Sequence, residues 1–340
     1  MAISLRAVAQ VAGAGDVRER LRVIRDGQAA LRVATVHAGL STGVLEALRT
    51  RRTTEELAAA LGATDLPLLE SFLRALAVNG LVVTTPSGHV LTRRGRAVLG
   101  DDVVRAGYEA FGGFHTDLYR DLPAQLAGGP GRRDVEERGD VIARLSRAME
   151  PLVRDALAAQ VRAVAPRRVL DVGCGEGSLL AHMLAVAPGA TGIGAELDDG
   201  AATRAEERLA APGLARRATV FRGDVRRLLA APEALRGPVD LVLLANVLYY
   251  VPPADRAEFL GSLAAELAPG GRIVIISTMA EPSAFSRHFA LLLQAQAGRM
   301  QLPTPAEVEG VLRGLGLEVV TSRRVVPGAP LHLVAARRPA

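Results

Sequence analysis

The chain has 340 residues, of which 49% are hydrophobic and 23% charged, and its formal net charge at neutral pH is +5. This length is enough for two domains of ordinary size, and the composition is typical of a globular protein. The longest apolar run, VDLVLLANVLYYV, is interrupted by Asp240 and Asn246 and is shorter than the roughly 18 residues of a spanning helix. The N-terminus has Arg6 inside its short apolar stretch and does not resemble a secretion signal. We therefore expect a cytoplasmic protein without a membrane partner.

The cysteine and lysine contents exclude several kinds of chemistry. Cys174 is the only cysteine, which excludes an internal disulfide and a zinc site built from several cysteines. All 41 residues in the Lys+Arg total are arginine, which excludes Schiff-base chemistry on a lysine amine. The histidines form no visible pair of metal ligands, so we expect no metal site.

The first hundred residues contain a helix–helix–hairpin pattern. Thr53 and Glu56 have the spacing of a capping box at the start of one helix, and Asp65 is placed to cap a second. Two short apolar runs, 81–85 and 89–92, flank a Pro-Ser-Gly turn and predict a two-stranded hairpin. Two helices followed by a hairpin indicate a winged helix-turn-helix module.

The charge of this module decides between two functions for it. Between residues 53 and 92 the only cation is Arg74, against four acidic residues. A DNA-reading helix needs cations for the phosphates and polar side chains for the base edges. We therefore expect a packing or dimerisation module and no nucleic-acid partner.

The pattern changes after residue 164. A Gly-rich charged loop is predicted over 121–140 and a helix over 141–163. Short apolar strands then alternate with helices, which predicts a parallel sheet covered on both faces, and the segments 317–326 and 331–338 form a closing antiparallel pair. The predicted parallel strands are RRVLDVG, ATGIGAEL, ATVFRGD, VDLVLLAN and GRIVIIS.

A glycine-rich turn follows the first of these strands. The strand ends at Asp171, and Gly173, Gly175 and Gly177 precede an apolar helix. Glycines at these positions let the backbone turn tightly and approach a ligand at the helix N-terminus. The spacing differs from the G-x-G-x-x-G of a dinucleotide fold because position 178 is Ser178.

The next three strands also end in polar residues, which are Glu196, Asp224 and Asn246. Ligands of open α/β sheets bind outside the carboxyl ends of the strands. An acid at the position of Glu196 accepts hydrogen bonds from ribose hydroxyls, and Asp224 is placed to accept from an adenine amine. Asp171 and Asn246 are placed to meet the amino-acid end of a ligand. The four residues together predict a nucleoside ligand.

The motifs VLDVGCGEG, GAEL, FRGDV, LLANVLYY and LAPGGRIVI resemble those of class I S-adenosylmethionine-dependent methyltransferases. With the winged helix in front, the chain resembles the two-domain small-molecule O-methyltransferases of bacterial secondary metabolism and plants. The resemblance implies a Rossmann-like α/β domain with a mostly parallel seven-stranded sheet and a C-terminal antiparallel hairpin, preceded by a mainly α winged-helix domain. It also implies S-adenosyl-L-methionine as cofactor and a homodimer formed through the N-terminal domain.

The resemblance divides the chain and places the cofactor. It implies a dimerisation domain over 1–105, connecting helices that contribute to the substrate pocket over 106–164, and a cofactor-binding methyltransferase domain over 165–340. The residues that it implies around the cofactor are Asp171, Gly173, Gly175, Glu196, Leu197, Asp224, Val225 and Asn246.

The base that deprotonates the acceptor is not evident. Relatives that methylate phenols commonly carry a histidine just after the fourth strand, whereas this chain has Tyr249 and Tyr250 there. His115 or His288 is a candidate base from elsewhere in the chain, and Tyr249 is a candidate for orienting the acceptor. Alternatively, the acceptor arrives ionised, as a thiol or carboxylate does.

The acceptor pocket is expected to include Phe111, Met149 and Tyr250, and a 3% aromatic content disfavours a large polycyclic substrate. The predicted function is methyl transfer to an oxygen, or alternatively a sulfur, of a small-molecule natural product by in-line displacement. Two alternatives stay open. One is a protein of this fold with a non-methylating activity, and the other is a winged-helix transcriptional regulator that senses a nucleoside ligand.

Overall fold

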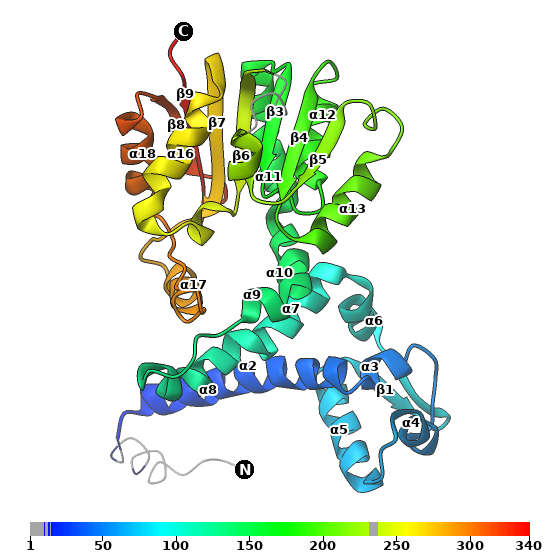
Figure 1. Cartoon of the computed structure of the whole chain (residues 1–340). Coiled ribbons are helices and arrows are strands. Elements are labelled where there is room, and N and C mark those ends of the chain that lie inside the picture. The colour runs from blue at the N-terminus through cyan, green and yellow to red at the C-terminus, as the bar shows by residue number, and fades with distance from the viewer. Residues whose placement is uncertain (1–9, 11–12, 14, 231–236) are drawn as a thin grey trace. The chain divides into compact units, whose positions relative to one another are not determined.

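The computed structural model describes residues 10, 13, 15–230 and 237–340. The chain forms two compact units (Figure 1). The N-terminal unit comprises the residues up to Pro123 together with 138–146, and the C-terminal unit comprises 124–137 and 147–340. The segment 106–164, expected to connect two domains, is therefore divided between the units.

The N-terminal unit has the predicted order of two helices and a hairpin. Thr53 and Glu56 form the reciprocal hydrogen bonds of a capping box at the start of α4, and the Asp65 side chain caps α5. Strands β1 (Val82–Thr85) and β2 (Gly88–Leu91) pair in antiparallel register. The helices of this unit are α2 (Val17–Ser41), α3 (Val44–Ala47), α4 (Thr54–Leu61), α5 (Leu66–Val78), α6 (Arg93–Gly100), α7 (Asp102–Gly112), most of α8 (Phe114–Leu126) and α10 (Gly139–Ser146).

The core of this unit lies between the helices and the hairpin. Leu73 and Leu76 on α5 are fully buried, and Leu81 and Leu91 of the hairpin pack into the same cluster. The apolar face that the 3.6-residue period predicts for α5 is therefore the face that packs inward.

Two predictions for segments near the sequence boundaries of the two units are wrong. The expected loop over 121–140 contains the end of α8 and the short helix α9 (Asp134–Glu137). A buried pair holds α9, because Arg132 Nε lies 2.8 Å from Asp134 Oδ2 and Gln296 Nε2 donates to the same oxygen over 2.9 Å. A sequence pattern does not reveal this distant contact.

The single helix expected over 141–163 is instead interrupted. It consists of α10, a 3-10 turn η1 (Arg147–Met149) and α11 (Glu150–Val164). Pro151 lies in the first turn of α11, where its missing N–H breaks no helical hydrogen bond. A proline is favourable in that first turn and unfavourable in the interior of one long helix, which accounts for the interruption.

The C-terminal unit is built on the predicted seven-stranded sheet, in the order β5-β4-β3-β6-β7-β9-β8. The first five strands in this order are mutually parallel, and β9 pairs antiparallel with both β7 and β8, so the predicted closing pair is confirmed. The strands are β3 (Arg168–Val172), β4 (Thr191–Glu196), β5 (Ala218–Arg222), β6 (Val239–Ala245), β7 (Leu267–Thr278), β8 (Glu318–Arg324) and β9 (Leu331–Arg337).

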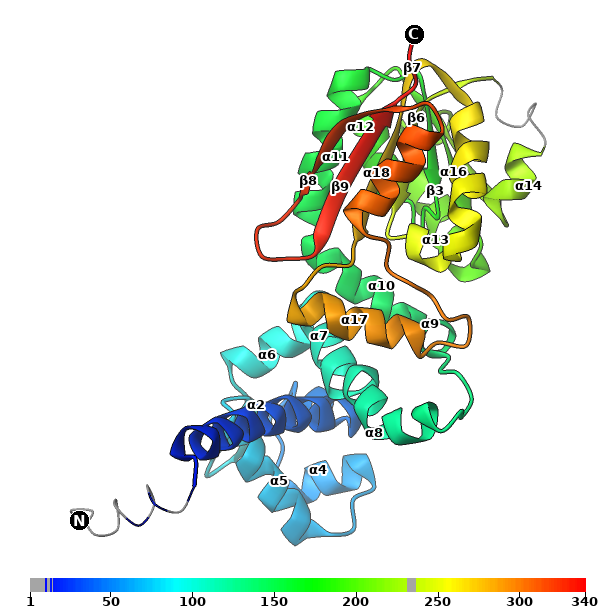
Figure 2. The ribbon, with the colours of Figure 1, turned by 90° about the vertical axis from the view of Figure 1, so that its left-hand side faces the viewer.

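Helices cover both faces of this sheet, as Figure 2 shows for α11 and α12 on one face and α16 and α18 on the other. Successive residues of β6 point to opposite faces of the sheet. Leu241 packs with α11 and α12, and Val242 packs with α16 and α18. The helical elements of the unit, besides α9, η1 and α11, are α12 (Ser178–Val186), α13 (Asp199–Leu209), α14 (Val225–Leu229), η2 (Leu248–Tyr250), η3 (Pro253–Asp255), α16 (Arg256–Ala265), α17 (Ala284–Gln294) and α18 (Pro305–Gly314). Among the described residues, no helix has both the length and the apolar character needed to cross a bilayer.

Candidate functional site

The glycine turn after β3 has the conformation that its glycines allow. Gly173, Gly175 and Gly177 have φ values of 65°, 55° and 73°, in the left-handed region that side chains disfavour. A Cβ added to Gly173 would lie 2.6 Å from Val247 Cγ2, whereas one added to Gly175 would meet no atom within 4 Å among the described residues. The backbone at Gly175 therefore borders open space. A ligand could approach it closely there.

Glu196, the last residue of β4, is linked to this turn. Its Oε2 accepts a hydrogen bond of 2.7 Å from the Gly175 backbone N–H, and its Oε1 accepts one of 2.9 Å from the Asp198 backbone N–H. Glu196 is half-buried, and the following residue, Leu197, is exposed. The carboxylate is thus fixed between two loops before any ligand arrives.

Asp171 presents a buried carboxyl group beside the turn. The residue is only 1% exposed, and its Oδ2 has no hydrogen-bond partner in the described part of the chain. Burial, reinforced by the negative charge of Glu196, raises the pKa of Asp171 to about 8. A buried acceptor without a partner is costly, so the site suits a ligand that brings a hydrogen-bond donor or a positive charge.

Asp224 and Asn246 follow the next two strands. Asp224 caps α14 by accepting from the Arg226 backbone N–H over 2.9 Å, and its neighbour Val225 is buried. Asn246 has a φ of 56°, unusual for a residue other than glycine. Its Oδ1 accepts from the Thr278 backbone N–H over 3.1 Å, which joins the ends of β6 and β7.

The polar strand ends lie along one edge of the sheet. Strands β5, β4, β3 and β6 are adjacent and parallel, so their carboxyl ends meet at the same edge. The structure therefore places the predicted cofactor residues from these four strands together.

An aromatic cluster lies beyond β6, where η2 meets α17. The Tyr249 ring is 4.6 Å from that of Tyr250 and 5.9 Å from that of Phe289, which it meets edge-on. Phe289 stacks on Phe285 one turn away, with ring centroids 6.2 Å apart. The chain's sparse aromatic residues are thus partly concentrated here, a feature that the low overall content concealed.

The titratable groups of this cluster differ in what they can do with a proton. Burial raises the pKa of Tyr249 well above its usual 10, and partial burial together with the charge of Glu196 raises the pKa of Tyr250, which is 41% exposed. Both phenols therefore stay protonated at neutral pH and are donors rather than bases. His288 on α17 is half-buried, and burial lowers its pKa below 6.5, so its imidazole is neutral and able to accept a proton.

The other predicted acceptor residues lie in different places in the fold. His115 belongs to the N-terminal unit, where its buried ring lies 4.9 Å from that of Phe111 and 4.6 Å from that of Phe114. Phe111 is partly exposed in the same unit. Met149 lies in η1 of the C-terminal unit and is 40% exposed.

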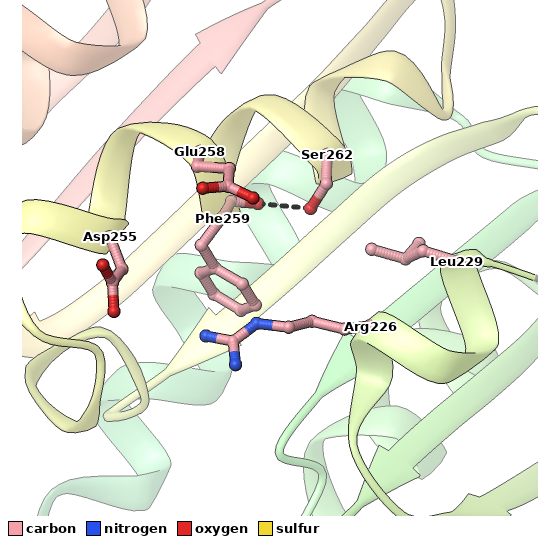
Figure 3. A pocket seen from close by; sticks show the side chains of 6 residues that line it. All are labelled: Arg226, Leu229, Asp255, Glu258, Phe259 and Ser262. Atoms are coloured by element: carbon pink, nitrogen blue, oxygen red, sulfur yellow. Dashed lines mark hydrogen bonds between the residues drawn. The ribbon is translucent and has the colours of Figure 1, made fainter.

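A separate hollow of about 430 Å³ lies between α14 and α16 (Figure 3). The Arg226 guanidinium lies 5.5 Å from the centroid of the Phe259 ring, and its Nη1 is 3.6 Å from Asp224 Oδ2. This hollow has no local signal in the sequence, because its two walls come from elements far apart in the chain. Its lining residues, none of them a predicted site residue, are Arg226, Leu229, Asp255, Glu258, Phe259 and Ser262.

No group of three or more His, Cys, Asp or Glu side chains that could hold a metal ion occurs within the described ranges. Cys174 is buried in the glycine turn, and burial raises the pKa of its thiol above its usual value. A thiol in this state is a poor nucleophile, which agrees with a packing role.

The sheet order, the antiparallel last strand and the polar strand ends around a glycine turn define a Rossmann-like α/β protein of the class I methyltransferase type. Residues 141–322 match the family model described as a methyltransferase domain, and the chain belongs to this family.

Similar proteins agree on the fold and differ in their named activities. Aclacinomycin 10-hydroxylase of Streptomyces purpurascens is 32% identical over 229 residues, which cover 65% of this chain and 56% of that protein. The structure of mitomycin 7-O-methyltransferase is 25% identical, with a TM-score of 0.72 and coverage of 97% of this chain and 99% of that one. A methyltransferase of calicheamicin biosynthesis in its S-adenosylhomocysteine-bound form is also 25% identical, with a TM-score of 0.63 and coverage of 96% and 99%. The chain spans about half the length of the curated relatives it matches, from 25% to 62%.

Proposed function

We propose that this protein transfers a methyl group from S-adenosyl-L-methionine to an oxygen of a small-molecule natural product. The observation that carries the proposal is the buried Asp171 carboxyl group beside the open backbone of Gly175, with Glu196 fixed next to both. The names of the mitomycin and calicheamicin relatives support a natural product as acceptor.

The strand ends account for each part of the cofactor. S-adenosylmethionine supplies a methyl group on a positively charged sulfonium. Asp171 accepts from the cationic amino group, which satisfies the buried Oδ2. Glu196 accepts from the ribose hydroxyls. Leu197, Asp224 and Val225 would hold the adenine, and Gly173, Gly175 and Asn246 would border the amino-acid end.

His288 is the base in this proposal. Its neutral imidazole takes the acceptor proton, and the protonated phenol of Tyr249 orients the acceptor as a hydrogen-bond donor. Tyr250 and Met149, both of the C-terminal unit, are the proposed lining of the acceptor pocket. His115 is the second candidate base. An acceptor that arrives ionised, such as a thiol, would need neither histidine.

A second candidate function is a non-methylating reaction on the same fold. It is favoured by the relative named as a hydroxylase, and by tyrosines rather than a histidine in η2. The regulator hypothesis has less support, because Arg74 is the only cation in the winged-helix segment 53–92.

An exposed apolar face on α2 supports a homodimer. Leu21, Ile24 and Leu31 are 62%, 56% and 67% exposed, and their spacing places them along one side of the helix. A second copy of the chain is the proposed partner of this apolar face. Light scattering should show a dimer for the wild type and a monomer for Ile24→Glu/Leu31→Glu, and a dimeric double variant would overturn this part of the proposal.

The test of the activity begins with calorimetric titration of S-adenosylmethionine and S-adenosylhomocysteine. Micromolar binding of both is expected, and binding of neither by folded protein would overturn the proposal. Methyl-labelled S-adenosylmethionine is then incubated with 1-naphthol, thiophenol and benzoate as a phenol, a thiol and a carboxylate. Label in the naphthol supports O-methylation, and label only in the thiol moves the acceptor atom to sulfur. Cofactor binding without any transfer favours the non-methylating function.

A further inference from the structure

Arg256, the first residue of α16, is a buried cation that the proposed function does not use. The residue is 2% exposed, and burying a guanidinium carries a large desolvation cost. Its place at the N-terminus of a helix is also electrostatically unfavourable for a positive charge. Such a residue persists only where its hydrogen bonds offset these costs.

The guanidinium binds three separate segments at once. Its Nε donates to the Val251 carbonyl over 3.1 Å, its Nη1 donates to Glu307 Oε1 over 2.5 Å, and its Nη2 donates to the Gln301 carbonyl. Val251 follows η2, Gln301 precedes α18, and Glu307 lies in the first turn of α18. The planar fork of arginine suits several acceptors in fixed directions.

The segments around Val251 and Gln301 contact the aromatic cluster at Tyr249. The Gln301 backbone N–H donates to the Tyr249 carbonyl over 3.4 Å. Next to it, Leu302 is buried against Tyr249 and against Leu293 of α17. Arg256 therefore holds the backbone at Val251, two residues after Tyr249, together with the segment that returns from α17 and bonds the Tyr249 carbonyl.

The third segment fixes the start of α18. Glu307 accepts from Arg256 through Oε1 and from the Thr304 backbone N–H through Oε2 over 3.4 Å, as part of a capping box. The preceding Pro303 carbonyl accepts from Ala280 beyond the end of β7 over 2.8 Å. The segment that contains α17 is thus held at both ends. The bond between Ala280 and Pro303 joins its two ends, and Arg256 binds the Gln301 carbonyl near its C-terminal end.

We propose that Arg256 is a positioning residue for the acceptor half of the site. It holds the segment 249–251 and the return segment 296–304 in one arrangement, and so sets where Tyr249, Phe289 and His288 lie. It makes none of the contacts around the glycine turn, so the cofactor half does not depend on it. The acceptor role rests on the proposed function, whereas the positioning itself does not.

The test compares Arg256→Lys and Glu307→Gln with a matched control, Glu309→Gln. Lysine keeps a positive charge opposite Glu307 but loses the guanidinium hydrogen bonds to the Val251 and Gln301 carbonyls. Glu309→Gln weakens a 2.7 Å ion pair with Arg313 on the same helix and a side-chain hydrogen bond with Ser322 of β8, and neither contact involves Tyr249. Hydrogen exchange is followed by mass spectrometry, and S-adenosylhomocysteine binding by calorimetry.

In Arg256→Lys we expect amide exchange about tenfold faster in 249–251 and 296–304, with strands β3 and β4 unchanged. S-adenosylhomocysteine affinity should change less than about twofold. The KM for an acceptor should rise about tenfold, measured with whichever of 1-naphthol, thiophenol and benzoate has the highest turnover. Glu307→Gln should shift both readouts in the same direction, and the control should shift neither.

Unchanged exchange in the two segments, or faster exchange throughout the unit, would overturn the positioning role. Faster exchange confined to these segments with an unchanged acceptor KM would overturn the link to the acceptor. A wild type that binds no S-adenosylhomocysteine would overturn the proposed function alone, because the exchange experiment decides the role of Arg256 without any ligand.

Discussion

The Glu196 carboxylate joins the end of β4 to the glycine turn after β3, through a hydrogen bond of 2.7 Å from the Gly175 backbone N–H to Oε2. The second bond, from the Asp198 backbone N–H to Oε1, fixes the orientation of the carboxylate. Hydrogen bonds to an ionised acceptor are stronger than those between neutral groups. The turn and its acidic neighbour are therefore organised before a ligand binds, which lowers the ordering cost of binding.

Replacing this carboxylate should weaken cofactor binding. In Glu196→Ala, affinity for S-adenosylhomocysteine should fall about tenfold or more, equivalent to about 1.4 kcal/mol, because the ribose loses its acceptor and the Gly175 amide its anchor. Calorimetric titration measures the change. Asp240→Asn is the matched control, since Asp240 accepts from the Arg167 and Arg168 amides over 2.7 and 2.8 Å at the opposite edge of the sheet. Equal losses in the two variants would contradict a specific role for Glu196.

Binding of S-adenosylmethionine should release a proton from Asp171. Below its pKa of about 8 this carboxyl group is mostly protonated, and a cationic ligand beside it favours the ionised form. At pH 7 the binding enthalpy should therefore differ between phosphate and Tris buffers, which differ in ionisation enthalpy, and at pH 9 the difference should vanish. Asp171→Asn should bind more weakly and show no buffer dependence. A buffer-independent enthalpy in the wild type would place the cationic group elsewhere.

The same group should make stability depend on pH. The folded chain keeps the Asp171 proton up to a pH of about 8, whereas the unfolded chain loses it near its ordinary pKa of 3.8. Between these values the folded state binds more protons, so the contribution of Asp171 to the free energy of unfolding falls as pH rises, by at most about 1.4 kcal/mol per unit. Urea unfolding at pH 5 and pH 8 measures this fall, and Asp171→Asn should lose part of it. An equal fall in both proteins would assign the dependence to other groups.

Gly175→Ala should separate backbone strain from ligand exclusion. Gly175 has a positive φ and open space around an added Cβ, and Gly213, with a φ of 86°, shares both properties in the loop before β5. Alanine in this conformation costs about 1–2 kcal/mol at either position, so both variants should lose similar stability in urea unfolding. Only Gly175→Ala should lose S-adenosylhomocysteine affinity, because its methyl group occupies space that the ligand needs. Retained affinity in Gly175→Ala would show that the ligand does not approach this turn.

Local signals in the sequence predicted most of the fold. Alternating apolar strands and helices gave the sheet, and the spacing of Thr53 and Glu56 gave a helix start, because these features depend on residues close in the chain. The interruption before Pro151 was missed, because the apolar period continues across it.

Contacts between distant segments could not be predicted in the same way. Arg256 carries no local signal for its bonds to Gln301 and Glu307, which only the folded chain brings near. The gathering of Tyr249 and Phe289 depends on the same long-range packing. The polar strand ends could be predicted from sequence because each lies at or just after the end of a strand, whereas the aromatic cluster around Tyr249 is assembled from segments far apart in the chain.

His288→Gln should lower turnover without changing cofactor affinity. The variant removes the proposed base, and general-base catalysis is worth about a hundredfold or more in rate. His115→Gln is the comparison, because His115 is buried between two aromatic rings in the N-terminal unit. Turnover of labelled S-adenosylmethionine with the panel acceptors measures both variants. A loss confined to His115→Gln would move the base to the N-terminal unit, and full activity in both would indicate an acceptor that arrives ionised.

The pH profile provides an independent check on His288. Burial lowers its pKa below 6.5, and the imidazole acts as a base only when neutral. The wild-type rate should therefore be level at neutral pH and fall as pH decreases through a value below 6.5. That acidic limb should disappear from the residual activity of His288→Gln. A limb that persists unchanged in this variant belongs to another group, and His288 would then be only a lining residue on α17.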